Sequence, residues 1–297
     1  MSPLLDSIAA DPRLVGAALP FGSGFVIAAM LRITLRRRRG DLAMLGALVA
    51  FLLVYALIEG LPPLLAVTAK QKLFWLACAG GVAGLAAGAG ARSGVLERSL
   101  LVLLPAAGLL WLGERQWLRG PETGFAVAAL ALWLGSAAIL LRLRATGTAG
   151  NGFAAGAQLV VAAAGLALVA LIGASASLAT LAGALAAGLG GVLALDYLVF
   201  LAAGRPTALG AAGRLGVAAP LCWIAAILVL YGDGVSPVAV ALLSLVFLSG
   251  RIPLRIGRAS AWLTRAGEPV RATLLAAIPA ALAVGVALLQ AGPAGYP

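Results

Sequence analysis

The feature that most constrains this chain is a series of long apolar runs, each bounded by charged or turn-forming residues. About 20 apolar residues cross a bilayer core, and runs of roughly this length recur along the whole chain. Their approximate bounds are 14–35, 42–59, 73–90, 99–112, 124–141, 153–173, 178–201, 215–231, 236–249 and 272–290. A lipid-exposed backbone must satisfy its own hydrogen bonds, so each run is expected to be a helix. The sequence therefore predicts an all-α, polytopic integral membrane protein with about ten transmembrane helices.

The composition excludes the other broad classes of protein. Hydrophobic residues make up 63% of the chain and charged residues 10%, whereas a water-soluble domain carries about a quarter charged residues. A disordered chain would need far more polar residues than this. No long polar linker interrupts the series of runs, so residues 1–297 are predicted to form a single membrane domain.

The basic residues predict the orientation of that domain. Of the 21 Lys and Arg residues, 16 fall on alternate connections, among them the cluster Arg36–Arg39. The basic-rich side of a membrane protein is cytoplasmic, which places both termini outside the cytoplasm of a cell inner (plasma) membrane. Anionic lipid headgroups are the expected partners of these arginines. No base-stacking aromatic residues interleave with them, so nucleic acid is not an expected partner.

Two sets of matching residues suggest an internal duplication, with halves at about 14–142 and 152–290. Gly60-Leu61-Pro62 resembles Gly204-Arg205-Pro206, and a Leu/Arg pattern at 112–119 recurs at 248–255 with the same spacing. Five helices in each half would make the halves inverted relative to each other, as in many transporters. A composition this rich in Leu, Gly and Arg also produces such matches by chance, and both interpretations stay open.

Four polar side chains within or near the runs are the candidate functional residues, because such groups are costly in lipid. Asp196 lies in the seventh run, Glu59 near the outer end of the second, Arg32 near the inner end of the first, and Gln158 in the sixth. They are candidates for substrate binding or proton coupling. A structural interpretation stands beside this one. Asp196 and Arg32 lie at similar depth and could form an ion pair, although extension of Arg32 toward the headgroups explains that residue equally well. Glu59 would face water.

Catalytic and cofactor signatures are absent from the sequence. There is no histidine, which removes histidine-ligated metals and histidine-based catalytic triads. The two cysteines, Cys78 and Cys222, lie in apolar runs and are too few for a structural zinc site. No P-loop is present. We therefore expect no catalytic residues, no metal and no cofactor.

One short stretch resembles a known family. Pro20-Phe21-Gly22-Ser23-Gly24-Phe25-Val26 is similar to the first-helix Gly-Ser-x-Phe-Val stretch of drug/metabolite transporters, which also have ten helices. That family keeps both termini inside, whereas the arginine distribution of this chain places both outside. The resemblance covers these seven residues only.

Three functions follow as hypotheses, of which a membrane enzyme acting on lipid ranks last. The first is a permease, similar to secondary transporters, for a small organic or lipid-like solute. The second is a non-catalytic membrane subunit or scaffold that binds a membrane-protein partner in a larger complex, which the scarcity of intramembrane polar groups favours. A water-accessible cavity near Glu59, Asp196 and Gln158 would favour transport, and dry packing would favour the scaffold.

Overall fold

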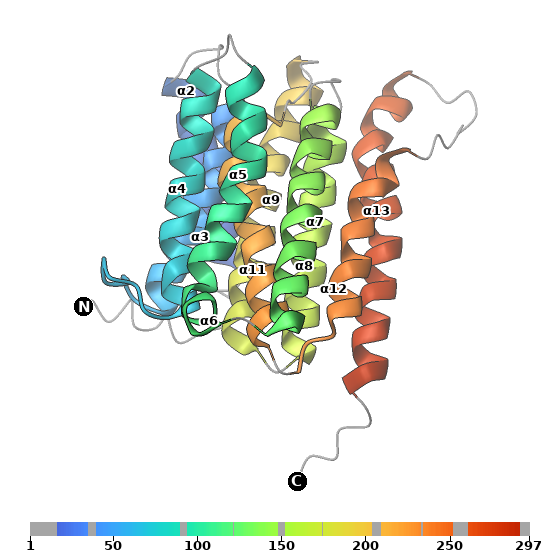
Figure 1. The fold of residues 1–297 in the computed structure, drawn as a ribbon. Helices are drawn as coiled ribbons and strands as arrows, with labels where there is room; N and C mark the ends of the chain where they lie inside the picture. The colour runs from blue at the N-terminus through green and yellow to red at the C-terminus, as the bar shows by residue number, and fades with distance from the viewer. Residues whose placement is uncertain are drawn as a thin grey trace, which may run out of the picture.

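The computed structural model describes residues 17–34, 40–89, 94–120, 122–147, 152–173, 175–203, 209–232, 234–251 and 261–291. Within these ranges every regular element is helical (Figure 1). The α-helices are α2 (Leu19–Thr34), α3 (Leu45–Ile58), α4 (Ala69–Ala89), α5 (Gly94–Leu112), α6 (Glu114–Arg119), α7 (Thr123–Gly147), α8 (Gly152–Ile172), α9 (Ala176–Ala203), α10 (Ala211–Gly213), α11 (Ala219–Tyr231), α12 (Pro237–Ser244) and α13 (Ala261–Ala291). The other helical turns are 3₁₀ at η2 (Gly40–Met44) and η4 (Leu245–Arg251) and π at η3 (Arg214–Ala218).

Six helical segments are long and apolar enough to cross a membrane. They are Gly94–Leu112, Thr123–Gly147, Gly152–Ile172, Ala176–Ala202, Ala211–Tyr231 and Val270–Ala291. Three shorter apolar helices, Leu19–Thr34, Leu42–Ile58 and Pro237–Ser249, coincide with further predicted runs. The chain is thus a multi-pass helical protein whose apolar helices suit a lipid bilayer.

The long helices run roughly parallel to one another, so the bundle has two ends (Figure 1). We call one the α6 end; it holds α6, the loop at 59–68 and the start of α12. We call the other the arginine-rich end; it holds Arg32, Arg144 and Arg214. Chain direction alternates from helix to helix, so each connection lies at one of these two ends.

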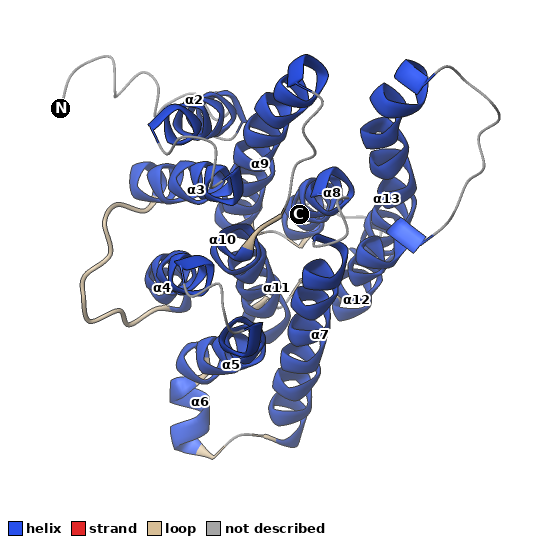
Figure 2. Ribbon diagram, turned by 90° about the horizontal axis from the view of Figure 1, so that it is seen from above, coloured by secondary structure: helices blue, strands red, loops and turns tan. Residues whose placement is uncertain are grey.

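The centre of the bundle is the segment Ala211–Tyr231, in which 83% of the residues of its most apolar stretch are buried. It is surrounded by α4, α5, α7 and α9, whereas α2 and α13 lie at the edges (Figure 2). Small residues allow the closest contacts, as expected where lipid gives no hydrophobic drive for helix association. A Cβ at Gly80 would lie 2.5 Å from the carbonyl oxygen of Leu215, and one at Gly24 would lie 2.5 Å from that of Gly188.

Several helices begin or end differently from the prediction. Lys70 and Lys72 were expected in a connection, but α4 already begins at Ala69. The reason is a capping box: Thr68 Oγ1 accepts from the Gln71 N–H at 3.3 Å, and Gln71 Oε1 accepts from the Thr68 N–H at 3.2 Å. Similarly, α5 starts at Gly94 and brings Glu97 into its first turn.

Two further differences from the predicted runs concern the helices that contain Pro105 and Pro237. The sequence alone allows the run 99–112 either to lengthen through neighbouring residues or to end early in a kink at Pro105. The structure shows the longer helix, since α5 extends from Gly94 through the buried Pro105 to Leu112. The predicted run 236–249 is divided instead, because α12 gives way to 3₁₀ geometry at Leu245. Such a change inside a membrane helix often accompanies a functional region.

The two predicted halves do not pack alike. Helix α8 packs along α13, the first and last long helices of residues 152–290. Their counterparts in residues 14–142, α2 and α7, lie on opposite sides of the bundle (Figures 1 and 2). The duplication therefore stays a hypothesis.

Candidate functional site

The four predicted polar residues do not meet at one place. Arg32 and Asp196 lie together at the arginine-rich end, and Glu59 lies at the α6 end. Gln158 lies in α8 and donates from Nε2 to Ser249 Oγ at 3.3 Å, which ties α8 to η4. A single polar site built from all four is therefore not what the structure contains.

The predicted pairing of Arg32 with Asp196 is confirmed. Arg32 in α2 donates to Asp196 in α9, and the Asp196 side chain is 1% exposed. The two helices lie close because neither Gly24 of α2 nor Gly191 of α9 places a side chain between their backbones. A charge this deeply buried requires such a partner, since an isolated carboxylate in an apolar environment is very costly.

A second ion cluster, which is partly buried, was not anticipated from the sequence. Glu97 accepts from Arg214 through Oε1, at 2.8 Å from Nε, and from Arg144 Nε through Oε2 at 3.1 Å. Arg214 also donates to the Leu209 carbonyl and is 5% exposed. Because Arg214 opens the π-helical turn η3, this cluster joins α5, α7 and the central helix at the arginine-rich end.

The α6 end contains a cavity of about 550 Å³ in which Glu59 and Lys70 are the charged lining residues. Its walls come from α3, the 61–63 loop, α4, α9 and α11, and they include Tyr55, Gln71, Ser175 and Tyr231. Lys70 Nζ donates to Ser177 Oγ at 2.8 Å and lies 3.4 Å from Glu59 Oε1. Polar and apolar atoms are mixed in this lining, so the cavity can hold a small molecule that carries polar groups.

The loop that walls this cavity is held in place by side chains of α4. Gly60 turns the chain out of α3 with a positive φ of 77°. Trp75 Nε1 then donates to the Pro63 carbonyl at 3.1 Å, and Gln71 Oε1 accepts from the Val67 N–H at 2.9 Å. The cavity is therefore a defined feature of the fold with a fixed outer wall.

Lys72 makes a separate interaction at the same end. Its side chain is almost fully buried, donates to Glu114 Oε2 at 2.8 Å and to the Trp111 carbonyl at 2.7 Å, and lies over the Trp111 ring. The hydrogen bond and positive charge of Lys72 hold the pKa of the Glu114 carboxyl below its ordinary value. This contact attaches α4 to the junction of α5 and α6.

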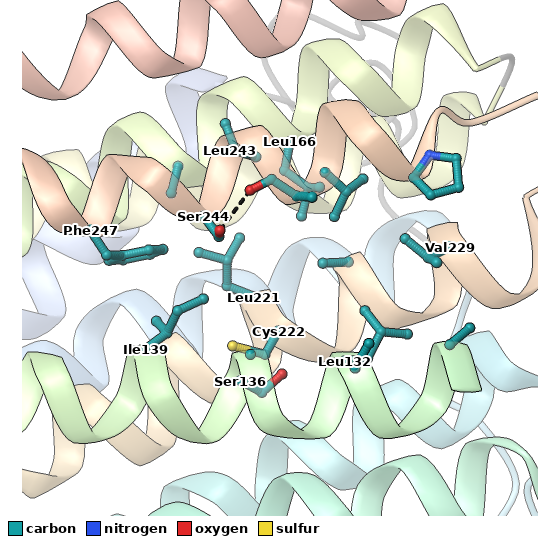
Figure 3. Close-up of a pocket in the computed structure, with 18 residues that line it drawn as sticks. Leu132, Ser136, Ile139, Leu166, Leu221, Cys222, Val229, Leu243, Ser244 and Phe247 are labelled. Carbon is teal, nitrogen blue, oxygen red and sulfur yellow. Dashed lines mark hydrogen bonds between the residues drawn. The ribbon is translucent and has the colours of Figure 1, made fainter. Parts of the chain in front are cut away.

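A second cavity, of about 400 Å³, lies between α7, α8, α11 and α12 (Figure 3). Its lining is apolar except for Ser136, Cys222 and Ser244. The Ser244 hydroxyl donates to the Ala241 carbonyl at 2.6 Å, so its hydrogen-bonding need is met within its own helix. None of the four predicted polar residues lines this cavity.

Both cysteines are free, and they are far from forming a metal site. Cys78 is half-buried in α4 and Cys222 is buried in α11. Within the described ranges, no group of three or more cysteine or acidic side chains is arranged to hold a metal ion. The chemistry that the described side chains offer is ionic pairing, hydrogen bonding and apolar contact.

Comparison with protein families and with curated proteins gives no match for this chain. Function must therefore be inferred from the two cavities and the charged groups.

Proposed function

We propose that the protein is a permease, similar to secondary transporters, for a small organic solute. The observation that carries this proposal is the polar cavity at the α6 end, with Glu59 and Lys70 in its wall. Glu59, one of the candidate residues, lines this cavity, which is of solute size. A carrier must offer such a site to one side of the membrane at a time.

The charges of the cavity indicate the chemistry of the solute. Lys70 Nζ has three donors, of which Ser177 takes one at 2.8 Å, and the contact to Glu59 is long at 3.4 Å. Glu59 also retains acceptor capacity because one of its oxygens is not engaged by Lys70. An anionic group beside Lys70 and a cationic or hydroxyl group beside Glu59 would both be satisfied. We therefore propose a zwitterionic or polyhydroxylated small solute.

The opposite end supports the same proposal, because ion pairs join its described helices to one another. Glu97 joins Arg214 and Arg144 there, and Arg32 joins Asp196. A carrier that is open to one side would have a polar cavity at that end and intact ion pairs at the other. In this proposal, opening the arginine-rich end requires these pairs to separate.

We further propose that the chain crosses the inner membrane about ten times and that the arginine-rich end is cytoplasmic. The three shorter apolar helices and α4 would complete the spans. In a Cys78→Ala/Cys222→Ala background, Leu118→Cys in α6 should react with an impermeant maleimide in intact cells. Thr34→Cys, at the end of α2, should react only after lysis. Both sites are exposed, so the opposite pattern would reverse the orientation.

The solute proposal is tested by binding and then by transport. The purified protein is screened for thermal stabilisation by amino acids, polyamines and sugars, because a ligand at 100 times its Kd adds about 2.7 kcal/mol to stability. A solute that stabilises the wild type should lose this effect in Glu59→Gln and Lys70→Met. Glu122→Gln, an exposed carboxylate at the same end outside the cavity, is the matched control. Uptake of that solute into proteoliposomes then completes the test, and binding unaffected by both cavity variants would refute it.

The second candidate is a membrane subunit or scaffold. It is favoured by the fact that Arg32, Asp196 and Gln158 are engaged in contacts between helices of this chain. Purification in mild detergent separates the two functions, since a subunit should bring a stoichiometric protein partner with it. The inverted duplication of 14–142 and 152–290 would strengthen the permease proposal, although the different packing of α8 with α13 gives it no support.

A further inference from the structure

The cavity between α7 and α12 has the chemistry of a site for hydrocarbon. No charged side chain lines it, and three of its lining residues carry polar side-chain atoms. The Ser244 hydroxyl is already bonded, and the Ser136 hydroxyl lies beside the Cys222 thiol (Figure 3). A polar ligand group placed here would lose its hydrogen bonds to water and gain few in return. The part of a ligand that enters must therefore be apolar.

The length of the cavity fits an acyl chain. Its lining on α7 runs from Ala128 to Ile139 and on α12 and η4 from Pro237 to Phe247. From Ala128 to Ile139 the α-helix rises eleven times by about 1.5 Å, or about 16 Å in all, which is close to half of the roughly 30 Å hydrocarbon core of a bilayer. The cavity is thus about as long as the acyl region of one leaflet.

The cavity is accessible from the side of the bundle. Ala131 and Gly135 on α7 are exposed, as are Pro237 and Ala241 on α12, and all four line the cavity. Because the side chains of these four residues are small, the cavity opens between α7 and α12 on the outside of the bundle. For a bundle within a bilayer, this surface faces lipid.

A more polar cavity of about 250 Å³ adjoins the apolar one at the α6 end, and Pro237 lines both. Its lining includes Ser236 and Gln290 but no charged side chain. Ser236 Oγ accepts from the Ala239 N–H at 3.1 Å, and within the described residues its hydroxyl donates to no protein atom. Gln290 adds an amide donor. These neutral donors match ester carbonyl oxygens, which accept hydrogen bonds and carry no charge.

We propose that the groove between α7 and α12 binds one acyl chain of a membrane lipid from the leaflet at the α6 end. The glycerol–ester region then lies against Ser236 and Gln290, and the headgroup extends into water. This site is separate from the polar cavity of the proposed permease, with which it shares no lining residue. Its test therefore does not depend on transport.

The test uses phosphatidylcholine with a diazirine in mid-chain, mixed into dioleoylphosphatidylcholine vesicles that hold the full-length protein. After illumination, adducts are mapped by mass spectrometry. Adducts should concentrate on groove residues such as Leu132, Leu221 and Val240. They should be severalfold fewer on Leu274 and Leu282 of α13, which are exposed on the bundle surface. Equal labelling of the groove and of α13 would overturn the proposal.

Two matched glycine variants sharpen the test. A Cβ at Gly135 meets no atom within 4 Å, so a side chain can start there, and Gly135→Phe should occupy the groove and reduce groove adducts severalfold. Gly285→Phe adds the same side chain to α13, where the glycine also has open space, and should leave the adducts unchanged. If Gly135→Phe does not give a monodisperse protein, Ala241→Leu fills the groove from its other wall.

Two further outcomes would also overturn the proposal. One is unchanged groove labelling in a well-folded Gly135→Phe or Ala241→Leu protein. The other is a copurifying ring compound, identified by extraction and mass spectrometry, that excludes the photolipid from the groove.

Discussion

Both ends of the bundle contain pairs of acidic and basic side chains, but the pairs differ in how deeply they are buried. At the arginine-rich end, Asp196 is buried, Glu97 is 14% exposed, and both are bonded to arginine side chains from other helices. At the α6 end, Glu59 and Lys70 are 27% and 39% exposed and lie 3.4 Å apart. Buried pairs are costly to break, because the remaining charge has no partner, whereas exposed pairs contribute little to stability. One end is therefore built to hold helices together, and the other leaves its charges accessible to a ligand.

The largest effect is expected at Glu97. Glu97→Gln leaves the buried Arg214 and the partly buried Arg144 without their shared counter-ion, which should destabilise the protein by about 3–5 kcal/mol. Thermal unfolding in detergent measures this as a fall in Tm. Glu122→Gln, which removes an exposed carboxylate, should leave Tm near the wild-type value. Equal Tm values for the two variants would remove the contrast between the ends.

The next effect is expected at Asp196. Asp196→Asn leaves Arg32 beside a neutral group and should cost a few kcal/mol, and Arg32→Gln in the same protein should recover part of the loss. A double-mutant cycle of the melting curves gives the coupling between the two residues. If Asp196→Asn keeps the wild-type Tm but loses solute uptake or its pH dependence, Asp196 serves a proton or substrate step instead.

A smaller, pH-dependent effect is expected from Lys72 and Glu114. The lowered pKa of Glu114 means that the pair stabilises the fold above the ordinary carboxyl pKa, and that this contribution is lost as pH falls through the lowered value. Glu114→Gln should therefore have a lower Tm than the wild type at neutral pH, and the two should converge in acid. A difference that stays constant with pH would show that the charge of Glu114 is not what matters.

The smallest effect on stability is expected from Glu59. Glu59→Gln removes a long, half-exposed pair and should change the free energy of unfolding by less than about 1 kcal/mol. In the permease proposal, the same change removes solute binding. A large fall in Tm on Glu59→Gln would mean that the α6 end is as tightly held as the arginine-rich end.

The helical character and the Arg32–Asp196 pair could be predicted because both follow from local pattern and depth. Apolar length predicts a helix in lipid, and a carboxylate deep in a span requires a cation at a similar depth. The pair could be named because the sequence contains few intramembrane charges from which to choose.

The Glu97 cluster could not be predicted, for two reasons. First, the predicted run begins at residue 99 and leaves Glu97 in the preceding connection, whereas α5 begins at Gly94. Second, its partners lie 47 and 117 residues away along the chain, and no local pattern links them. The Thr68–Gln71 capping box, in contrast, is a local signal that could have moved Lys70 and Lys72 into α4.

Both cavities were also beyond sequence analysis, because each is made by residues from at least four separate segments. Cys222 was correctly expected among apolar side chains, but nothing in its run indicates open space beside it. Gly135 gives no such signal either, since an exposed glycine on α7 is indistinguishable in sequence from one that packs against a neighbour.

Helix α11 has a position that links the two cavities. Ile227 and Tyr231 line the polar cavity from one face of this helix, while Cys222, Ala225 and Val229 line the apolar groove from another. In the permease proposal, a rotation or shift of α11 would change both volumes at once. Thermodynamic reciprocity then applies: by whatever factor a lipid in the groove alters solute affinity, the solute alters lipid affinity by the same factor. Bilayer composition would in this way become an effector of the solute site, transmitted through one central helix.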